Sequence, residues 1–403
     1  MNTLKLAWQY LWSRPLTTTL NLLLLTLGLA AMAVVLIAQD QLDRAFERDL
    51  RGIDAVVGAK GSPLQLILSG VFHIDAPTGN IALEDLQLLR NHPMVAQTIP
   101  LSMGDNLQGF RVIGTTTDYP AHYGATLAQG RWWTQPMEAV LGAQAARTTG
   151  LAVGQGFVGT HGLGNGGAVH GDSRYAVTGV LAPCGCVLDR LVLTATESVW
   201  QVHDDMHATD DMDDEDRAAI AADREVTVAL IRYKSPLATL SFPRFVNGET
   251  AMQAASPALE VARLMSLFSV GAQVLQGLGG VLLGVAGLSV FIALWNAVRE
   301  RRADLAMLRM LGAPPRRVAA LLLCESLWLA ALACVLGLLA AHGAMAMVGA
   351  LAMAEQSISV DGWRWAPFEA GVPLLAFGVA VIAALVPSVS AYRVDVTHLL
   401  NAR

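Results

Sequence analysis

The sequence lacks the short motifs of enzymes that act on nucleotides, peptides or esters. It contains no GxxxxGK[ST] motif, so the chain does not build the backbone cradle that holds nucleotide phosphates. It also contains no HExxH and no GxSxG, and its serine, histidine and acidic residues form no recognisable catalytic spacing. We therefore expect no catalytic residue and no cofactor in this chain. A separate subunit would have to supply any ATP hydrolysis that drives it.

Cysteine is scarce as well. Four cysteines are too few for a disulfide framework, and Cys324 and Cys334 fall inside a long apolar run. Cys184 and Cys186 form a CGC sequence in the polar part of the chain. A disulfide that closes across one residue is strained, and the spacing matches no strong motif. Free thiols and reversible redox chemistry therefore both remain open for this pair, as does the absence of any role.

Basic residues are too few for a nucleic-acid partner, because the net charge is −6 and they form no long patch. Apolar residues, in contrast, make up 54% of the 403 residues, and the mean hydropathy is +0.46. These values indicate a membrane protein whose chain also has room for a soluble domain.

Long runs without charge predict four membrane-spanning helices. The first run, Pro15–Gln39, has 25 residues, more than the ~20 that cross a bilayer. A signal peptide has an apolar region of only roughly 7–15 residues, so we expect a retained span. The run Leu264–Val298 has 35 residues and must tilt, kink or continue as a stalk. We expect an N-terminal amphipathic helix at 1–15, spans at 16–39, 264–298, 318–340 and 372–392, an outer loop at 341–371 and a tail at 393–403.

Residues 40–263 have the composition of a soluble domain of about 220 residues, large enough for its own core. β-like runs and helical patterns alternate there with Gly-rich turns, which predicts an α+β domain between the first two spans, with stalk helices at its ends. Within it, Ser62–Phe72 is unusually apolar but too short to span a bilayer. A buried core helix and an interfacial segment both fit this run.

Arginines concentrate between the second and third expected spans. Arg299–Arg317 contains six arginines against one Glu and one Asp, whereas the 341–371 loop contains one arginine. Short Lys/Arg-rich loops stay on the cytoplasmic side, so we expect both termini inside and the 40–263 domain outside.

The same stretch has a helical pattern. Leu305, Leu308 and Leu311 recur at three-residue spacing, and Arg302 and Arg309 share another face. Gly312, followed by two prolines, ends the pattern. A short rigid helix between two spans suits contact with a cytosolic partner, and a loop that only sets the topology is the alternative.

Two features lie inside the spans. Gly280 and Gly284 form a GxxxG, which makes that face of the second span a candidate for close helix packing. Glu325 is an intramembrane carboxylate, which is costly and therefore usually paired or functional. We expect it to pair with an arginine of Arg299–Arg317, and a transport role is the alternative.

The acidic run His203–Asp216 is the remaining candidate for a binding site. His203 and His207 are four residues apart, and nearby aspartates offer oxygen ligands for Zn²⁺. Runs of this composition are usually solvated loops, so we assign no metal site and keep the two histidines as the alternative.

The run Glu300–Ala340, ERRADLAMLRMLGAPPRRVAALLLCESLWLAALACVLGLLA, resembles the signature of FtsX/MacB-like ABC transporter permeases. Ser13–Leu20, SRPLTTTL, resembles the entrance to the first span in that family. In the family the loop after the second span contacts the ATPase. Asp304 stands where the family more often has Glu, which leaves the charge unchanged. The resemblance implies an ATPase contact through Arg299, Arg301, Arg302, Asp304, Leu305, Leu308, Arg309 and Gly312.

The resemblance also implies a function and its partners. The chain would be the permease subunit of an ATP-driven transporter in the bacterial inner membrane, moving its outer domain to export or extract a substrate. Its partners would be cytosolic ABC ATPases that hold ATP and Mg²⁺, a second permease copy or a homologous permease, membrane lipid, and an extracytoplasmic partner. The alternative is a mechanical regulator of that outer partner which transports nothing. The sequence does not identify the substrate.

Overall fold

The computed structural model describes residues 3–162, 169–207, 224–300, 307, 310, 313–354 and 361–392. They divide into two compact units, each described here by itself. The membrane unit comprises residues 3–42, 267–354 and 361–392, and the outer unit comprises Asp43–Ser266.

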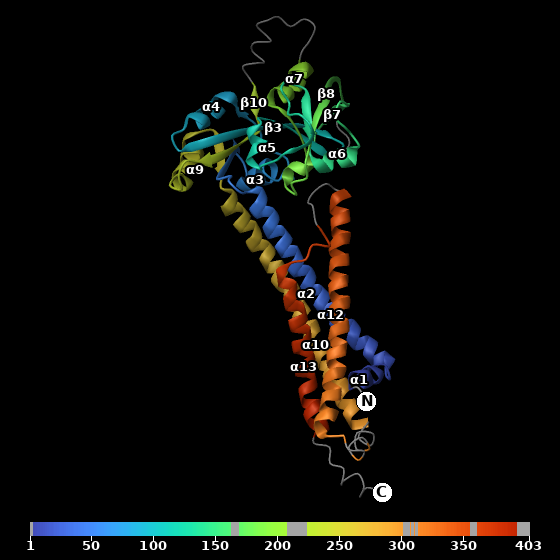
Figure 1. Ribbon diagram of the computed structural model, residues 1–403. Helices are drawn as coiled ribbons and strands as arrows, with labels where there is room; N and C mark the ends of the chain where they lie inside the picture. The colour runs from blue at the N-terminus through green and yellow to red at the C-terminus, as the bar shows by residue number, and fades with distance from the viewer. Residues whose placement is uncertain are drawn as a thin grey trace, which may run out of the picture. The chain divides into compact units, whose positions relative to one another are not determined.

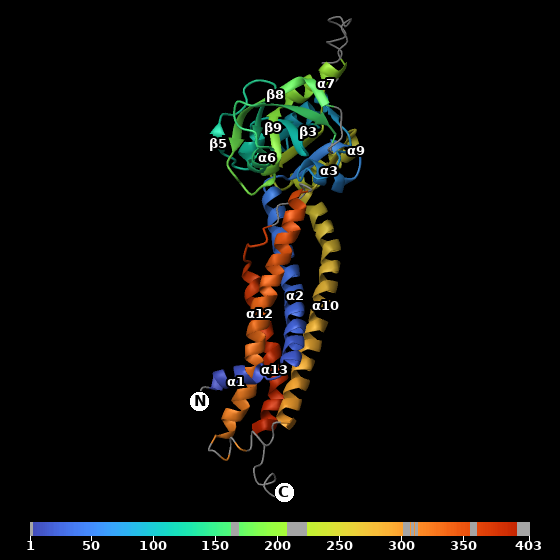
Figure 2. The same cartoon turned by 90° about the vertical axis from the view of Figure 1, so that its right-hand side faces the viewer.

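The membrane unit is built from long helices that lie side by side (Figures 1 and 2). Four of the described helices are long and apolar enough to cross a membrane, as the charge-free runs predicted. The helices are α1 (Thr3–Leu11), α2 (Pro15–Asp49), α10 (Pro257–Glu300), α12 (Pro315–Ala354) and α13 (Gly371–Tyr392), with a 3₁₀ turn, η2, at Pro367–Ala370.

α2 continues past residue 39 to Asp49 and α10 begins at Pro257, where stalk helices were expected. α12 instead continues past residue 340 to Ala354, into the stretch predicted as a loop. The reason is local: residues 341–354 are mostly alanine, methionine and leucine, which favour helix, and contain no proline. The polar loop after α12 is therefore shorter than the sequence predicted.

Small residues let these helices approach closely. A Cβ at Gly28 of α2 or Gly279 of α10 would lie about 3 Å from a side chain of the opposite helix, Leu283 or Met32. A Cβ at Gly337 of α12 would lie 3.0 Å from Leu29 of α2. In lipid, such backbone proximity provides van der Waals contact that larger side chains would prevent. α2 therefore packs closely against both α10 and α12.

The outer unit is an α+β domain around one mixed sheet, as predicted. The ten-stranded sheet has the order β12-β1-β11-β3-β4-β9-β6-β8-β5, and β7 pairs with both β3 and β8. The pairs β4–β9 and β6–β8 are parallel, and the other pairs are antiparallel. The strands are β1 (Ala55–Ala59), β2 (Ile81–Ala82), β3 (Val95–Leu107), β4 (Phe110–Thr115), β5 (Leu127–Gly130), β6 (Glu138–Leu141), β7 (Gly156–His161), β8 (Val169–Leu181), β9 (Leu191–Ala195), β10 (Glu225–Val226), β11 (Val228–Tyr233) and β12 (Met252–Ala255).

The helices of this unit cover both faces of the sheet. They are α3 (Pro63–Gly70), α4 (Leu83–Asn91), α5 (Asp118–His122), α6 (Ala143–Thr149), the 3₁₀ turn η1 (Val187–Arg190), α7 (Thr196–His207) and α9 (Ala238–Glu249). Successive residues of a strand point to opposite faces. Val228 and Leu230 of β11 accordingly join one core cluster, whereas Ala229 and Ile231 join another. Burial on both faces explains why the strand is apolar throughout.

The segment Ser62–Phe72 forms the buried core helix rather than an interfacial one. Ser62 caps α3 by accepting the N–H of Gln65 at 3.4 Å, and Pro63 occupies its first turn. Leu66 and Ile67 are fully buried in the core. The apolar composition of this run is therefore explained by packing within the domain.

A buried polar pair crosses this core. His73 Nε2 lies 2.9 Å from the hydroxyl of Tyr119, and both side chains are at least nine-tenths buried. Burial, and secondarily the charge of Arg111, holds the pKa of His73 well below its usual range, so the ring is neutral. The other ring nitrogen, Nδ1, has no hydrogen-bond partner among the described residues. The Tyr119 hydroxyl is therefore important, because it supplies the hydrogen bond that the buried His73 ring has among the described residues.

We predict that Tyr119→Phe lowers the free energy of unfolding of the outer unit by about 1–3 kcal/mol, because it leaves His73 Nε2 buried without a partner. Native-state proteolysis of the full chain measures this change. Tyr392→Phe removes an exposed hydroxyl and serves as the control, with an expected change below about 0.5 kcal/mol. Equal susceptibility of the two variants would contradict the importance of the Tyr119 hydroxyl.

Candidate functional site

The arginine-rich stretch Arg299–Arg317 lies between α10 and α12. Arg299 is exposed in the last turn of α10, and Arg316 and Arg317 lie in the first turn of α12. Met307 and Met310 are helical and exposed. The candidate residues outside the described part are Arg301, Arg302, Asp304, Leu305, Leu308, Arg309 and Gly312. Their role stays a prediction.

An ion pair fixes the end of α10 next to this stretch. Arg14, at the corner between α1 and α2, pairs with Glu300, the last residue of α10. The two side chains are 36% and 58% exposed, so the pair contributes little to stability, about 0–1 kcal/mol. The ion pair matters for position rather than for stability, because it connects the start of the arginine-rich stretch to the first span.

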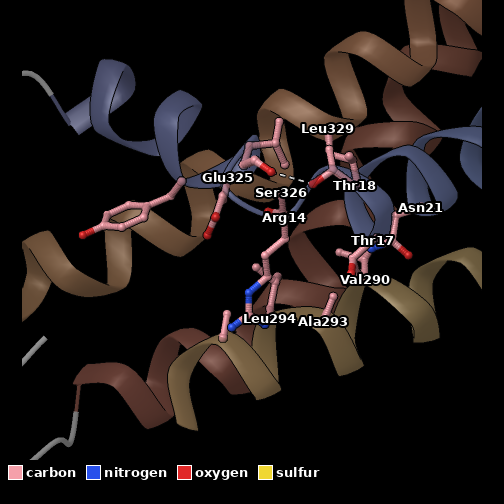
Figure 3. Close-up of a pocket in the computed structure, with 13 residues that line it drawn as sticks. Arg14, Thr17, Thr18, Asn21, Val290, Ala293, Leu294, Glu325, Ser326 and Leu329 are labelled. Carbon is pink, nitrogen blue, oxygen red and sulfur yellow. Dashed lines mark hydrogen bonds between the residues drawn. The ribbon is translucent and has the colours of Figure 1, made fainter. Parts of the chain in front are cut away.

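The corner between α1 and α2 is held by hydroxyl groups. The buried Thr18 hydroxyl donates to the carbonyl of Leu11 at 2.6 Å, shown dashed in Figure 3, and Ser13 donates to the carbonyl of Tyr10 at 2.6 Å. Trp8 of α1 packs edge-on against Trp328 of α12, with ring centroids 5.2 Å apart. The hydroxyl contacts hold the corner between α1 and α2, and the tryptophan contact joins α1 to α12.

A pocket of about 490 Å³, part of it open to the surroundings, lies where these helices meet (Figure 3). Four polar side chains in it are at least nine-tenths buried: Thr18, Asn21, Glu325 and Ser326. Asn21 of α2 accepts a hydrogen bond of 2.5 Å from Ser289 of α10. The other lining residues are Tyr10, Leu11, Arg14, Thr17, Val290, Ala293, Leu294, Ala297 and Leu329.

Glu325 comes from α12 and is 6% exposed, so the structure places the intramembrane carboxylate in this pocket beside Thr18, Asn21 and Ser326. Its expected pairing with an arginine of Arg299–Arg317 stays a prediction, because three of those six arginines lie outside the described residues. Arg14 lines the same pocket (Figure 3). The sequence interpretation missed Arg14, although the presence of a lone arginine just before the first span was a usable signal.

Gly280 and Gly284 do not make the close helix contact within this chain. A Cβ at either position would meet no atom of the described residues within 4 Å, and Gly277 is equally open. Gly279, one residue earlier in the sequence than Gly280, faces α2 instead. The GxxxG therefore lies on a face of α10 that is open in this single chain.

In the outer unit, the end of α2 is fixed by polar contacts at Asp49. The Tyr123 hydroxyl donates to the Asp49 carbonyl at 2.9 Å, and the Val187 N–H donates to the Asp49 carboxylate at 3.3 Å. Burial raises the pKa of Asp49, and the neighbouring Arg48 opposes that shift. The stalk formed by α2 is thus held where it ends.

The CGC sequence lies beside this contact and forms a disulfide between Cys184 and Cys186. The Asp189 carboxylate accepts the N–H groups of Cys184 and Gly185 at 3.0 and 2.7 Å. Of the states that the sequence left open, the structure contains the oxidised one. The disulfide braces the loop whose next residue, Val187, contacts Asp49.

The histidine candidates for a metal site are at the end of α7. His203 and His207 are helical, but their side chains and the acidic run after them lie outside the described residues. In the part of the chain that the structure describes, no group of three or more His, Cys, Asp or Glu side chains could hold a metal ion.

Comparisons with known proteins identify the two halves of the chain. Residues 18–254, more than half of the chain, match the model of the MacB-like periplasmic core domain, and residues 277–396 match the FtsX-like permease C-terminal model. A curated relative is the pyoverdine export ATP-binding/permease protein PvdT of Pseudomonas putida. It is 26% identical over 197 residues, which cover 46% of this chain and 28% of that protein.

Solved structures of two outer domains are also similar, at TM-scores too low to carry an argument. The periplasmic region of MacB from Actinobacillus actinomycetemcomitans has a TM-score of 0.34 and 11% identity, covering 54% of this chain and 96% of that one. The extracellular domain of the noncanonic ABC-type transporter YknZ from Gram-positive bacteria has a TM-score of 0.31 and 12% identity, covering 50% and 100%. The two family models, together with the four apolar helices, show that the chain belongs to the FtsX/MacB-like family of ABC transporter permeases.

Proposed function

We propose that this chain is the permease subunit of an ATP-driven complex, in which a separate cytosolic ATPase binds ATP and Mg²⁺ and presses on Arg299–Arg317. The observation that carries the proposal is the attachment of that stretch to the first span. Arg14 pairs with Glu300 at the start of the stretch, and α1 packs through Trp8 on Trp328 of α12, the helix that follows the stretch. A push on the stretch would then reach α2, α10 and α12 together. Both termini would be cytoplasmic and the outer unit periplasmic.

The two stalks would carry this movement outward. α2 has 35 residues and α10 has 44, whereas about 20 suffice to cross a bilayer. Each helix contributes residues to both units, so movement of the inner ends would reach the outer domain, to export or extract a substrate. The contacts at Asp49 would couple α2 to Tyr123, which follows α5, and to Val187 of η1.

The lengths of the stalks favour mechanical transmission whether or not a substrate crosses this subunit. A regulator that only activates an extracytoplasmic partner is therefore the second candidate.

We further propose that a second permease copy or a homologous permease packs against the open face of α10. Gly277, Gly280 and Gly284 leave room there for a close helix approach. Val281 and Val285 are exposed beside them. Contact with lipid alone gives no reason for a row of glycines on this face. A second helix, in contrast, would pack into the space that the missing side chains leave.

Charge reversal at Arg302 and Arg309 tests the contact with the ATPase. We expect Arg302→Glu with Arg309→Glu to weaken association by about 2–5 kcal/mol, roughly 30- to 4000-fold, because a desolvated charge pair loses one member. Co-purification and ATPase assays measure the effect, and Leu308→Asp should act in the same direction. Arg364→Glu reverses an exposed charge elsewhere and should leave both readouts unchanged. If the double variant co-purifies normally with the ATPase, the stretch only sets the membrane topology and does not contact the ATPase.

Bulk on the open face of α10 tests the second copy. We expect Gly280→Ile with Gly284→Ile to lower the dimer fraction in nanodiscs, measured by mass photometry, because side chains there block backbone approach. Leu275→Phe adds bulk at an exposed position on another face, about 140–180° around the helix from the three glycines, and should leave the dimer fraction unchanged. An unaltered dimer fraction in the glycine variant would place the subunit contact elsewhere.

Reconstitution separates the two candidate functions. The purified permease–ATPase complex in proteoliposomes should move or extract a substrate on addition of ATP if it is a transporter. A complex that hydrolyses ATP and activates its outer partner without moving any substrate would establish the regulator instead. The Arg302/Arg309 double variant is the matched control, since neither activity should survive in it.

A further inference from the structure

Residues 361–366, the described part of the loop before η2 and α13, are fastened to the helices around them. Gln41 of α2 donates to the carbonyl of Asp361 at 2.7 Å and accepts the N–H of Asp361 at 3.2 Å. A Cβ at Gly362 would lie 2.3 Å from backbone atoms of Ala346, so the loop backbone rests directly on α12. All of these residues belong to the membrane unit.

A buried histidine of α12 holds the same loop from the other side. His342 is 1% exposed, and its Nδ1 lies 2.7 Å from the carbonyl oxygen of Gly362. Its Nε2 lies 2.9 Å from Oε2 of Glu369, which is 3% exposed. The other carboxylate oxygen, Oε1, accepts the N–H of Ala366 at 2.7 Å. We call His342, Gly362, Ala366 and Glu369 the outer clasp.

Counting donors shows that the outer clasp needs an additional proton. A neutral imidazole has one N–H, and an ionised carboxylate and a carbonyl oxygen can only accept. With a neutral ring and an ionised Glu369, one of the two nitrogen–oxygen contacts would bring two lone pairs together in a buried place. Either a doubly protonated ring or a protonated Glu369 satisfies both contacts. Both arrangements hold one proton more than the neutral ring with the carboxylate.

We propose that His342 and Glu369 form a proton-binding site, and that the bound proton fastens the loop between α12 and α13 to α12. Because Gln41 holds the same loop, the proton also strengthens the connection of α12 and α13 to α2. The inference does not depend on the proposed permease activity.

The surroundings contribute few other charges. Asp361 and Arg364, in the same loop, are exposed, and α2 contributes Asp40 near Gln41. α12 has no other charged side chain from Ser326 to Ala354, and α13 has none from Gly371 to Tyr392. Trp363 stacks on the imidazole with an interplanar angle of 5°, and Trp365 lies at a centroid distance of 4.7 Å. The two indoles restrict the access of water to the pair.

The location of the proton can be tested directly in the wild-type chain. We expect histidine-selective ¹⁵N NMR of the chain in nanodiscs at neutral pH to show a ring protonated on both nitrogens, assigned by its absence in His342→Gln. A carboxylic-acid band in the infrared spectrum that disappears in Glu369→Gln would support the proposal equally. A ring with one bare nitrogen and no carboxylic-acid band would overturn it.

The role of the proton can be tested with Glu369→Gln. The amide of this variant can donate to His342 Nε2 and accept from Ala366, so it satisfies a neutral ring without a proton. As pH rises, we expect amide hydrogen exchange in residues 361–371 to accelerate about tenfold more in the wild type than in the variant. A difference of about tenfold corresponds to the loss of one buried hydrogen bond. Comparison at each pH cancels the intrinsic pH dependence of exchange.

Each result of this comparison is decisive. Parallel exchange profiles in the wild type and Glu369→Gln would overturn the role of the proton. If Glu369→Gln exchanges rapidly at every pH, the amide cannot replace the protonated pair and the proposed geometry is wrong. The His342→Leu variant should show rapid amide exchange in residues 361–371 at every pH. Its rate gives the exchange rate expected of an open clasp.

Discussion

Hydrocarbon offers the polypeptide backbone no hydrogen-bond partner, and this constraint shapes the whole membrane unit. The long helices satisfy their N–H and C=O groups internally, so polar contacts between them depend on a few side chains. These are concentrated at two levels: Asn21, Ser289 and Glu325 around the pocket, and Gln41, His342 and Glu369 around the outer loop. Between the two levels, small residues such as Gly28 and Gly337 bring the helices into direct contact. Such a bundle can carry a displacement along its axis without breaking hydrogen bonds in its middle.

Much of this architecture could be predicted from the sequence because desolvation costs are large and local. Charge-free runs predicted the four spans, and the residues of Glu300–Ala340 were sufficient to indicate the family. The mixed domain was predictable for a similar reason, since β-branched runs and Gly-rich turns determine where strands form. The end of α12 was misjudged because the expected span was ended at bilayer length, whereas residues 341–354 contain no proline and no Asp, Glu, Lys or Arg and favour helix.

The polar contacts could not be predicted in the same way, because they depend on which helices face each other. His342 and Glu369 are 27 residues apart, and nothing in the spacing of either residue indicates the other. The sequence interpretation identified Gly280 and Gly284 as a packing seam, but the close contact with α2 is made by Gly279, about 100° around the helix from Gly280. The disulfide remained open as well, because a CGC sequence does not determine whether its surroundings favour the oxidised state. The network at Asp49 combines residues from three distant parts of the chain, which only the fold brings together.

The topology of the sheet limits the ways in which the outer domain can recognise a partner. Among the described strands, β7 pairs with both β3 and β8, and the ends of the sheet order are β12 and β5. The edge strands β12 and β5 have only four residues each. An extended peptide that joins a sheet as an extra strand needs a row of unpaired backbone groups, and short edges offer few of them. Addition of a peptide strand at β12 or β5 is therefore disfavoured, and the same short edges limit sheet-to-sheet aggregation at these two strands.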